Sequence, residues 1–122
     1  MELKTKRFIR IDDLDLYIIR RIYEDKYITT WVITKEFFGK ENIPTKEGKR
    51  FIERKHVNIK KKLKKMEGWG ILIITKNFDN RNIYNFIKDK IHIGKHKFPD
   101  GYMKNTICLK INNNWIACEQ WL

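Results

Sequence analysis

Residues 46–65 read KEGKRFIERKHVNIKKKLKK and combine a dense positive charge with the spacing of an amphipathic helix. Ten of these side chains are Lys or Arg and two are Glu, so 10 − 2 = +8 of the chain's net charge of +12 lies here. The less polar residues recur at intervals of three and four, which aligns them in one stripe of a helix. They are Ile52, His56, Ile59, Leu63 and Met66.

The opposite face of this predicted helix is cationic, because successive residues turn by about 100° around the axis. A helix of this kind can dock one side on a core and present the other to a groove lined by phosphates. We therefore interpret it as a nucleic-acid recognition helix, with a merely solvated lysine-rich face as the alternative. The exposed face is expected to hold Arg50, Arg54, Val57, Asn58, Lys61, Lys64 and Lys65.

The length and composition indicate a single domain with a polyanionic partner. The chain has 122 residues, which can bury a modest core, and its excess of Lys and Arg fits nucleic acid or an acidic membrane surface. No apolar run reaches the roughly 18 residues of a membrane span. The charged start MELKTKRFIR has no apolar signal core, so we expect a cytoplasmic protein.

Two shorter helices are predicted before the basic one. The first begins with Asp12 as N-cap, continues with acidic residues Asp13 and Asp15 in its first turn, and ends near Asp25. The second covers residues 30–38, with Thr29 or Thr30 as its cap and Gly39 at its end.

The limits of the basic helix follow from the residues around it. Pro44 blocks continuation from the preceding helix, and Thr45 can cap the next one. Gly48 weakens the first turn, so we place the start nearer Lys49. The end is expected at Gly68 or Gly70.

The rest of the chain has β-type patterns. Residues 69–75 and 83–87 should form a hairpin, whose polar connection carries two cations, Lys76 and Arg81. Two further strands, 106–111 and 115–121, are joined by a run of three asparagines. Another strand is expected at 91–97, followed by a turn at Pro99, Asp100 and Gly101.

The two cysteines can be placed only if the length of the asparagine loop is known. With a three-residue loop, Ile111 would pair with Trp115, and Cys108 would lie opposite Cys118. The pair would then be either a disulfide or, as cytosolic chemistry favours, two small core residues. A loop of any other length would separate them.

Three helices followed by a β-hairpin is the order of a winged helix-turn-helix domain. The segment IDDLDLYIIRRI resembles the opening helix of the leucine-responsive regulator family and other archaeal winged-helix regulators. VNIKKKLKKMEGWGILIITK resembles the family's exit from the recognition helix into the first wing strand. The matching positions are Ile59, Leu63, Met66, Gly70 and Ile71.

This resemblance covers residues 11–88 and implies an α+β winged-helix fold that binds DNA, with the third helix in the major groove and the wing on the backbone or minor groove. Residues 1–10 would be a basic segment, and residues 89–122 would add antiparallel strands packed on the same domain. The link from Gly39 to Phe51 is longer than a standard tight turn, so the third helix is extended or the turn is remodelled. The strands after Lys88 are too short for the family's ligand-binding domain, so no effector is expected.

Metal binding and catalysis are not expected. His92 and His96 would lie roughly 13 Å apart on a strand, too far to share a zinc ion with Cys108 and Cys118. The sequence has neither a phosphate-binding glycine loop nor a nucleophile motif, so we expect no cofactor and no enzyme activity.

Roles on DNA follow from side-chain chemistry. Arginine pairs with guanine and asparagine with adenine, whereas lysine suits phosphates. The N-terminal cations Lys4, Lys6, Arg7 and Arg10 would form either a second basic arm or a solvated tail. We predict base-edge contacts from Arg50, Arg54, Asn58 and Lys61, and phosphate contacts from Lys49, Lys60, Lys62, Lys64, Lys65, Lys76 and Arg81.

The sequence therefore predicts a small transcriptional regulator that binds specific double-stranded DNA, as a possible homodimer. One alternative is a winged-helix protein-interaction module, in which Trp115 and Trp121 on one strand face would contact a partner instead of completing the core. The other is a sequence-indifferent chromatin or RNA-binding protein that relies on lysine.

Overall fold

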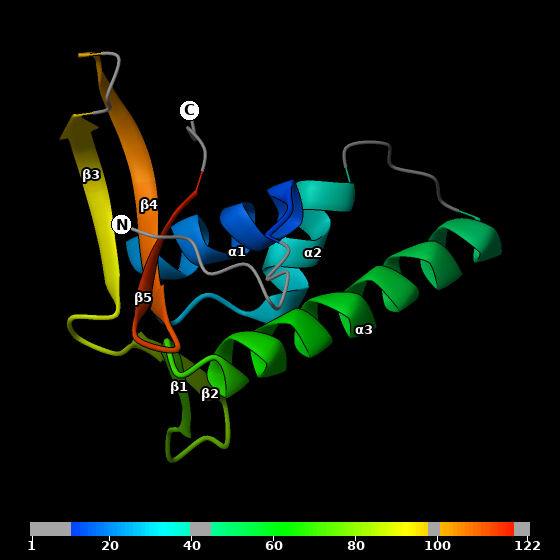
Figure 1. The fold of residues 1–122 in the computed structure, drawn as a ribbon. Helices are drawn as coiled ribbons and strands as arrows, with labels where there is room; N and C mark the ends of the chain where they lie inside the picture. Colours follow the sequence, from blue (N-terminus) through cyan, green and yellow to red (C-terminus); the bar gives the residue numbers. More distant parts are fainter. Residues whose placement is uncertain (1–10, 40–44, 98–100, 119–122) are drawn as a thin grey trace.

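The computed structural model describes residues 11–39, 45–97 and 101–118, and it has an α+β fold of three helices followed by antiparallel strands (Figure 1). The longest helix crosses the molecule, and the strands form two separate sheets of two and three strands. The helices are α1 (Asp13–Glu24), α2 (Thr30–Phe38) and α3 (Lys46–Gly68). The strands are β1 (Leu72–Lys76), β2 (Asn82–Phe86), β3 (Ile91–Lys97), β4 (Met103–Ile111) and β5 (Asn114–Cys118).

Side-chain caps fix the start of each helix, as predicted for Asp12 and for the threonines. The Asp12 carboxylate accepts a hydrogen bond from the backbone N–H of Asp15 (2.8 Å), and the Asp15 carboxylate accepts one from the N–H of Asp12 (3.1 Å). This reciprocal pair is a capping box. Thr29 caps α2 by accepting a hydrogen bond from the N–H of Val32, and Gly39 follows the last turn.

The start of α3 differs from the prediction. We expected Gly48 to delay it to about Lys49, but the helix begins at Lys46. The Thr45 hydroxyl accepts a hydrogen bond from the N–H of Gly48 at 3.1 Å. A cap of this kind contributes about 1 kcal/mol, which offsets the similar helix-propensity penalty of a glycine. The third helix is therefore extended at its start, while residues 40–44 of the link lie outside the described residues.

The end of α3 also explains why β1 starts three residues later than the predicted 69. Gly70 adopts a positive φ of 78°, a backbone conformation that favours glycine. The N–H of Gly70 then donates to the carbonyl of Glu67, and the N–H of Ile71 donates to that of Met66. These two bonds close the helix in a Schellman motif. Trp69 and Gly70 thus form the C-terminal cap of the helix, and strand pairing begins at Leu72.

The prediction for the C-terminal hairpin was wrong by one residue. The turn has two residues, Asn112 and Asn113, with φ values of 51° and 62°. Two successive positive φ values are typical of a type I′ turn, which asparagine tolerates and which matches the twist of a hairpin. Ile111 therefore pairs with Asn114, and not with Trp115.

This shift also separates the two cysteines along the ladder. Cys108 lies opposite Ala117, while Cys118 lies opposite Ile107 on the other face. The register thus excludes the pairing that a three-residue loop would have produced, and Cys108 is a free thiol. On its other side, Cys108 lies opposite His92 of β3.

The strands occur in the predicted order, and their bounds are close to the predicted ones. β3 covers the predicted residues 91–97, and β4 begins at Met103, three residues before the predicted start. β5 is described to Cys118, and the remainder of the predicted strand, with Trp121, lies outside the described residues. Pro99 and Asp100 of the predicted turn also lie outside the described residues. Trp115 is partly buried.

One apolar cluster joins the helices to both sheets. Its fully buried members come from every helix and from the strands. The stripe of α3 enters this cluster through its C-terminal half, while Ile52 and His56 at its other end are only partly buried. Among the described residues no helix is long and apolar enough to cross a membrane. The cluster contains Ile18, Ile19, Ile22, Ile28, Ile33, Ile59, Leu63, Met66, Ile71, Leu72, Tyr84, Ile107, Leu109 and Ile111.

Candidate nucleic-acid interface

The outward side of α3 carries exposed cations directly opposite its buried residues. Ile59, Leu63 and Met66 have at most 2% of their surface exposed and anchor the helix. The opposite side is solvent-exposed, as the sequence predicted. We call the exposed polar residues of this side the basic face; it consists of Arg50, Arg54, Asn58, Lys61 and Lys64, together with Lys49 and Lys60 on its flank.

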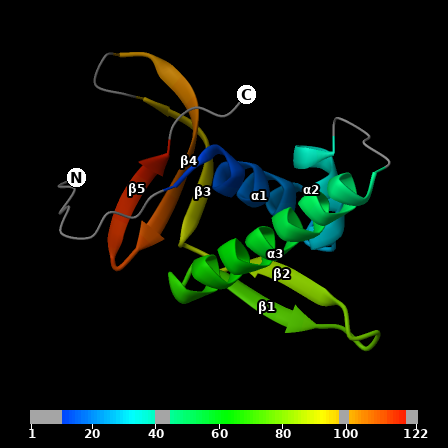
Figure 2. The same ribbon diagram turned by 90° about the vertical axis from the view of Figure 1, so that its right-hand side faces the viewer.

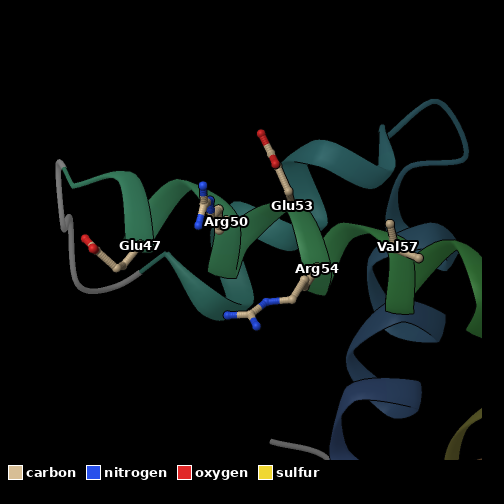
Figure 3. Close-up of a pocket in the computed structure, with 5 residues that line it drawn as sticks. All are labelled: Glu47, Arg50, Glu53, Arg54 and Val57. Atoms are coloured by element: carbon tan, nitrogen blue, oxygen red, sulfur yellow. The ribbon is translucent and has the colours of Figure 1, made fainter.

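The arginines of the basic face, Arg50 and Arg54, form no ion pair with any residue that the structure describes. Figure 3 shows Arg54 extending back along the helix toward the turn that carries Arg50, in a hollow of about 510 Å³. Glu47 and Glu53 line the same hollow and make it mixed in charge.

A second hollow continues along the helix from Arg54 to Lys61. It has a volume of about 540 Å³ and is also lined by Asn58. Val57, between these residues, is 48% exposed, so an apolar surface lies among the polar groups. Arginine, asparagine and an apolar contact on one helix face are the chemistry with which helices read base edges and thymine methyl groups.

Lys55 lies at the edge of this hollow but is held by aromatic rings. Its ammonium lies 5.1 Å from the ring centre of Phe38 and 5.4 Å from that of Phe51. The two rings also meet edge-on at 6.1 Å. Cation–π contact therefore joins α3 to the end of α2 at this point.

Lys62 and Lys65, predicted as phosphate contacts, instead form ion pairs with the start of α1. The Lys62 ammonium lies 2.8 Å from the Asp12 carboxylate and 3.2 Å from that of Asp15. Lys65 lies 3.4 Å from Asp15 and also covers the ring of Trp69. The carboxylate of Asp15 is completely buried, so removal of its partners would leave a charge without compensation.

These contacts shift the titration of both partners. Burial alone would raise the pKa of Asp12, but the hydrogen bond from Lys62, the backbone N–H of Asp15 and the charge of Lys62 lower it to about 2. Burial alone would lower the pKa of Lys62, yet its bonds and charge interactions with Asp12 and Asp15 raise it. Acidic residues at this helix N-terminus were predicted from the sequence, but the lysines that face them were not.

The other flank of α3 contacts α2 through His56. Its Nε2 lies 2.7 Å from the Thr30 hydroxyl, and its ring meets that of Trp31 edge-on at 4.7 Å. Burial, together with the charge of Lys60, lowers the pKa of His56. His56 is thus a residue at the edge of the core, as predicted.

The β1–β2 hairpin carries its two predicted cations at an ordered tip. Lys76 and Arg81 are exposed. The side-chain oxygen of Asn77 accepts hydrogen bonds from the N–H groups of Asp79 (3.0 Å) and Arg81 (2.9 Å), and the backbone bonds between residues 77 and 81 close the turn. Phe78 at this tip is 99% exposed.

Across residues 11–39, 45–97 and 101–118, no three His, Cys, Asp or Glu side chains gather in a way that could hold a metal ion. The basic residues Lys4, Lys6, Arg7 and Arg10 lie outside the described residues.

Comparison with known proteins adds no relative. No protein-family model matches the chain, and searches of curated proteins and of solved structures also found no match.

Proposed function

We propose that this chain binds specific double-stranded DNA through a winged-helix fold and acts as a small transcriptional regulator. The single observation that carries the proposal is the basic face of α3, where Arg50, Arg54 and Asn58 are exposed on consecutive turns. Arginine can bond guanine through two atoms and asparagine can do the same with adenine. A surface that served only as a phosphate contact would not need these two residue types.

The dimensions of α3 suit the major groove. Its 23 residues correspond to a length of about 34 Å, and a B-DNA major groove about 12 Å wide admits a helix. We assign base edges to Arg50, Arg54, Asn58 and Lys61. The phosphate contacts in this proposal are Lys49, Lys60 and Lys64 on the helix and Lys76 and Arg81 on the hairpin.

The hairpin supports the winged-helix interpretation by its position. It directly follows α3, and Figures 1 and 2 show it projecting beside the C-terminal part of that helix. The N–H of Tyr84 in β2 also donates to the carbonyl of Lys26, in the link between α1 and α2. This bond ties the hairpin to the helical part of the fold.

Lys62 and Lys65 have a different role in the proposal. Their ion pairs with Asp12 and Asp15 fix α1 against α3, and this orients the basic face. They position the helix and are not among the proposed phosphate contacts.

The test is in-vitro selection from random duplexes with the full chain. We expect an enriched motif, and a palindromic motif would also indicate a homodimer. A variant with Arg50→Ala and Arg54→Ala should lose the motif, while Lys95→Ala, an exposed cation on β3, should keep it. Tight binding with no enriched motif would favour the sequence-indifferent alternative, and absence of binding would favour a protein-interaction module.

A further inference from the structure

The tip of the β1–β2 hairpin presents an aromatic ring to solvent. Phe78 is 99% exposed, whereas the next most exposed large apolar residue of the described chain, Tyr102, is 69% exposed. Isolated apolar side chains on a surface are common and need no explanation. The surroundings of Phe78 distinguish it from such cases.

The turn that carries Phe78 is held in one shape. The side-chain oxygen of Asn77, which precedes the ring, accepts hydrogen bonds from the N–H groups of Asp79 and Arg81, which follow it. Asn80 completes the turn with a positive φ of 60°, which asparagine tolerates. Because the turn is closed by these bonds, the ring is directed outward by the backbone.

The charges beside the ring narrow the choice of partner. Lys76 and Arg81 flank it, and Asp79 is the only acidic residue of the turn, so the tip carries +2 − 1 = +1. An apolar side chain between cations suits insertion between stacked bases, with the cations on the adjoining phosphates. Anionic membranes are recognised by clusters of about four to eight Lys or Arg, and this tip has only two such residues, which favours DNA over a bilayer.

We propose that Phe78 is a wedge that enters the minor groove beside the site of α3, partly unstacks one base step and bends the duplex. This inference rests on the proposed function. Apolar wedges of this type kink DNA by about 20–90° toward the major groove. Flexible pyrimidine–purine steps would be the preferred points of insertion.

The test compares the wild-type chain with Phe78→Ala and Phe78→Leu on a duplex labelled with a dye at each end. Energy transfer should report a bend of at least 20° for the wild type and for Phe78→Leu, which keeps an apolar wedge. Phe78→Ala should bind without bending, with an unchanged salt dependence. Tyr102→Ala is the matched control, because it removes another exposed aromatic ring and should leave the bend intact.

A second duplex with an unpaired two-nucleotide bulge provides an independent measurement. Such DNA is already unstacked, so the wild type should bind it more tightly than the straight duplex, and Phe78→Ala should bind both alike. Salt-dependent binding to a straight duplex that never bends would overturn the wedge and leave the proposed function standing. If the wild type bound no DNA at all, both the wedge and the proposed function would be overturned. Binding to anionic phospholipid vesicles that depends on Phe78, with DNA bending unaffected by its removal, would assign the ring to a membrane instead.

Discussion

At the scale of single residues, Arg54 is the side chain best placed to read a base. It lines both hollows of the basic face, and it is exposed. Lys64 lies on the same face nearer the C-terminus of α3 and carries a point charge suited to phosphate. Substituting each of these two residues therefore separates the recognition of bases from contact with phosphates.

We expect Arg54→Ala to weaken binding to the selected site by about 1–3 kcal/mol and to relax base preference at one position. Lys64→Ala should weaken all sequences alike and reduce the slope of log K against log salt by about one. Fluorescence anisotropy with selected and scrambled duplexes measures both effects. Equal losses on both duplexes for both variants would contradict base reading by Arg54.

Residue-level signals predicted the caps but not the ion pairs. Asp12, Thr29 and Thr45 could be assigned from sequence because a cap depends on the next three residues alone. The contacts of Lys62 and Lys65 depend on how α1 is rotated against α3, which is a property of tertiary packing. Among seven predicted phosphate ligands, nothing local marked these two as different.

At the scale of elements, the contact between α1 and α3 should depend on pH. The folded state lowers the pKa of Asp12 to about 2 from an ordinary value of 3.8, so its contribution to stability is complete above about pH 4. That contribution is lost as the pH falls from about 4 to 2, because protonation removes the charge that Lys62 binds. The side chain is half exposed, and solvent screening reduces the effect.

We expect Asp12→Asn to remove this part of the acid dependence while it keeps the cap, because asparagine is an equally good N-cap residue. Urea midpoints measured between pH 2 and 6 should fall more steeply for the wild type than for the variant below pH 4. Asp13→Asn, a neighbour that is exposed and forms no ion pair within the described residues, is the control and should follow the wild type. Parallel curves for the wild type and Asp12→Asn would show that the pair contributes nothing.

The residues in the turns determined which ends of helices and strands could be predicted to the exact residue. The Schellman end of α3 requires the αL position that Gly70 fills, and a glycine marks such positions in a sequence. The run of three asparagines gave no such mark, because each can adopt a positive φ, and two of the three do so. The loop length, and with it the pairing of Cys108, could not be read from the residues.

At the scale of the whole molecule, binding should be dominated by released counterions. The proposal leaves five phosphate contacts, Lys49, Lys60, Lys64, Lys76 and Arg81, so log K should fall against log salt with a slope near −4.5. Affinity would then decrease roughly a few hundredfold between about 50 and 200 mM salt. Titration by anisotropy measures this slope. A slope shallower than about −2 would mean that the basic face does not lie on the duplex.

The order of helices and strands followed from local patterns, but their assembly did not. Periodicity located α1, α2, α3 and the five strands in the correct sequence. It could not show that β3, β4 and β5 form a sheet separate from β1 and β2, because pairing between distant strands depends on contacts that no short segment contains. Ile107, Leu109 and Ile111 join the helical core through this second sheet.

The two hairpins should respond differently to changes in chain length. An extra residue between positions 77 and 81 lies beyond the paired strands and leaves the β1–β2 register intact, but it would break the hydrogen bonds to Asn77 that orient Phe78. An extra residue beside Asn112 would slip the register of β5 by one position and turn Ile116 away from the core. The first hairpin can therefore be lengthened without loss of strand pairing, although the proposed wedge would be lost, whereas the second admits changes of residue type but not of length.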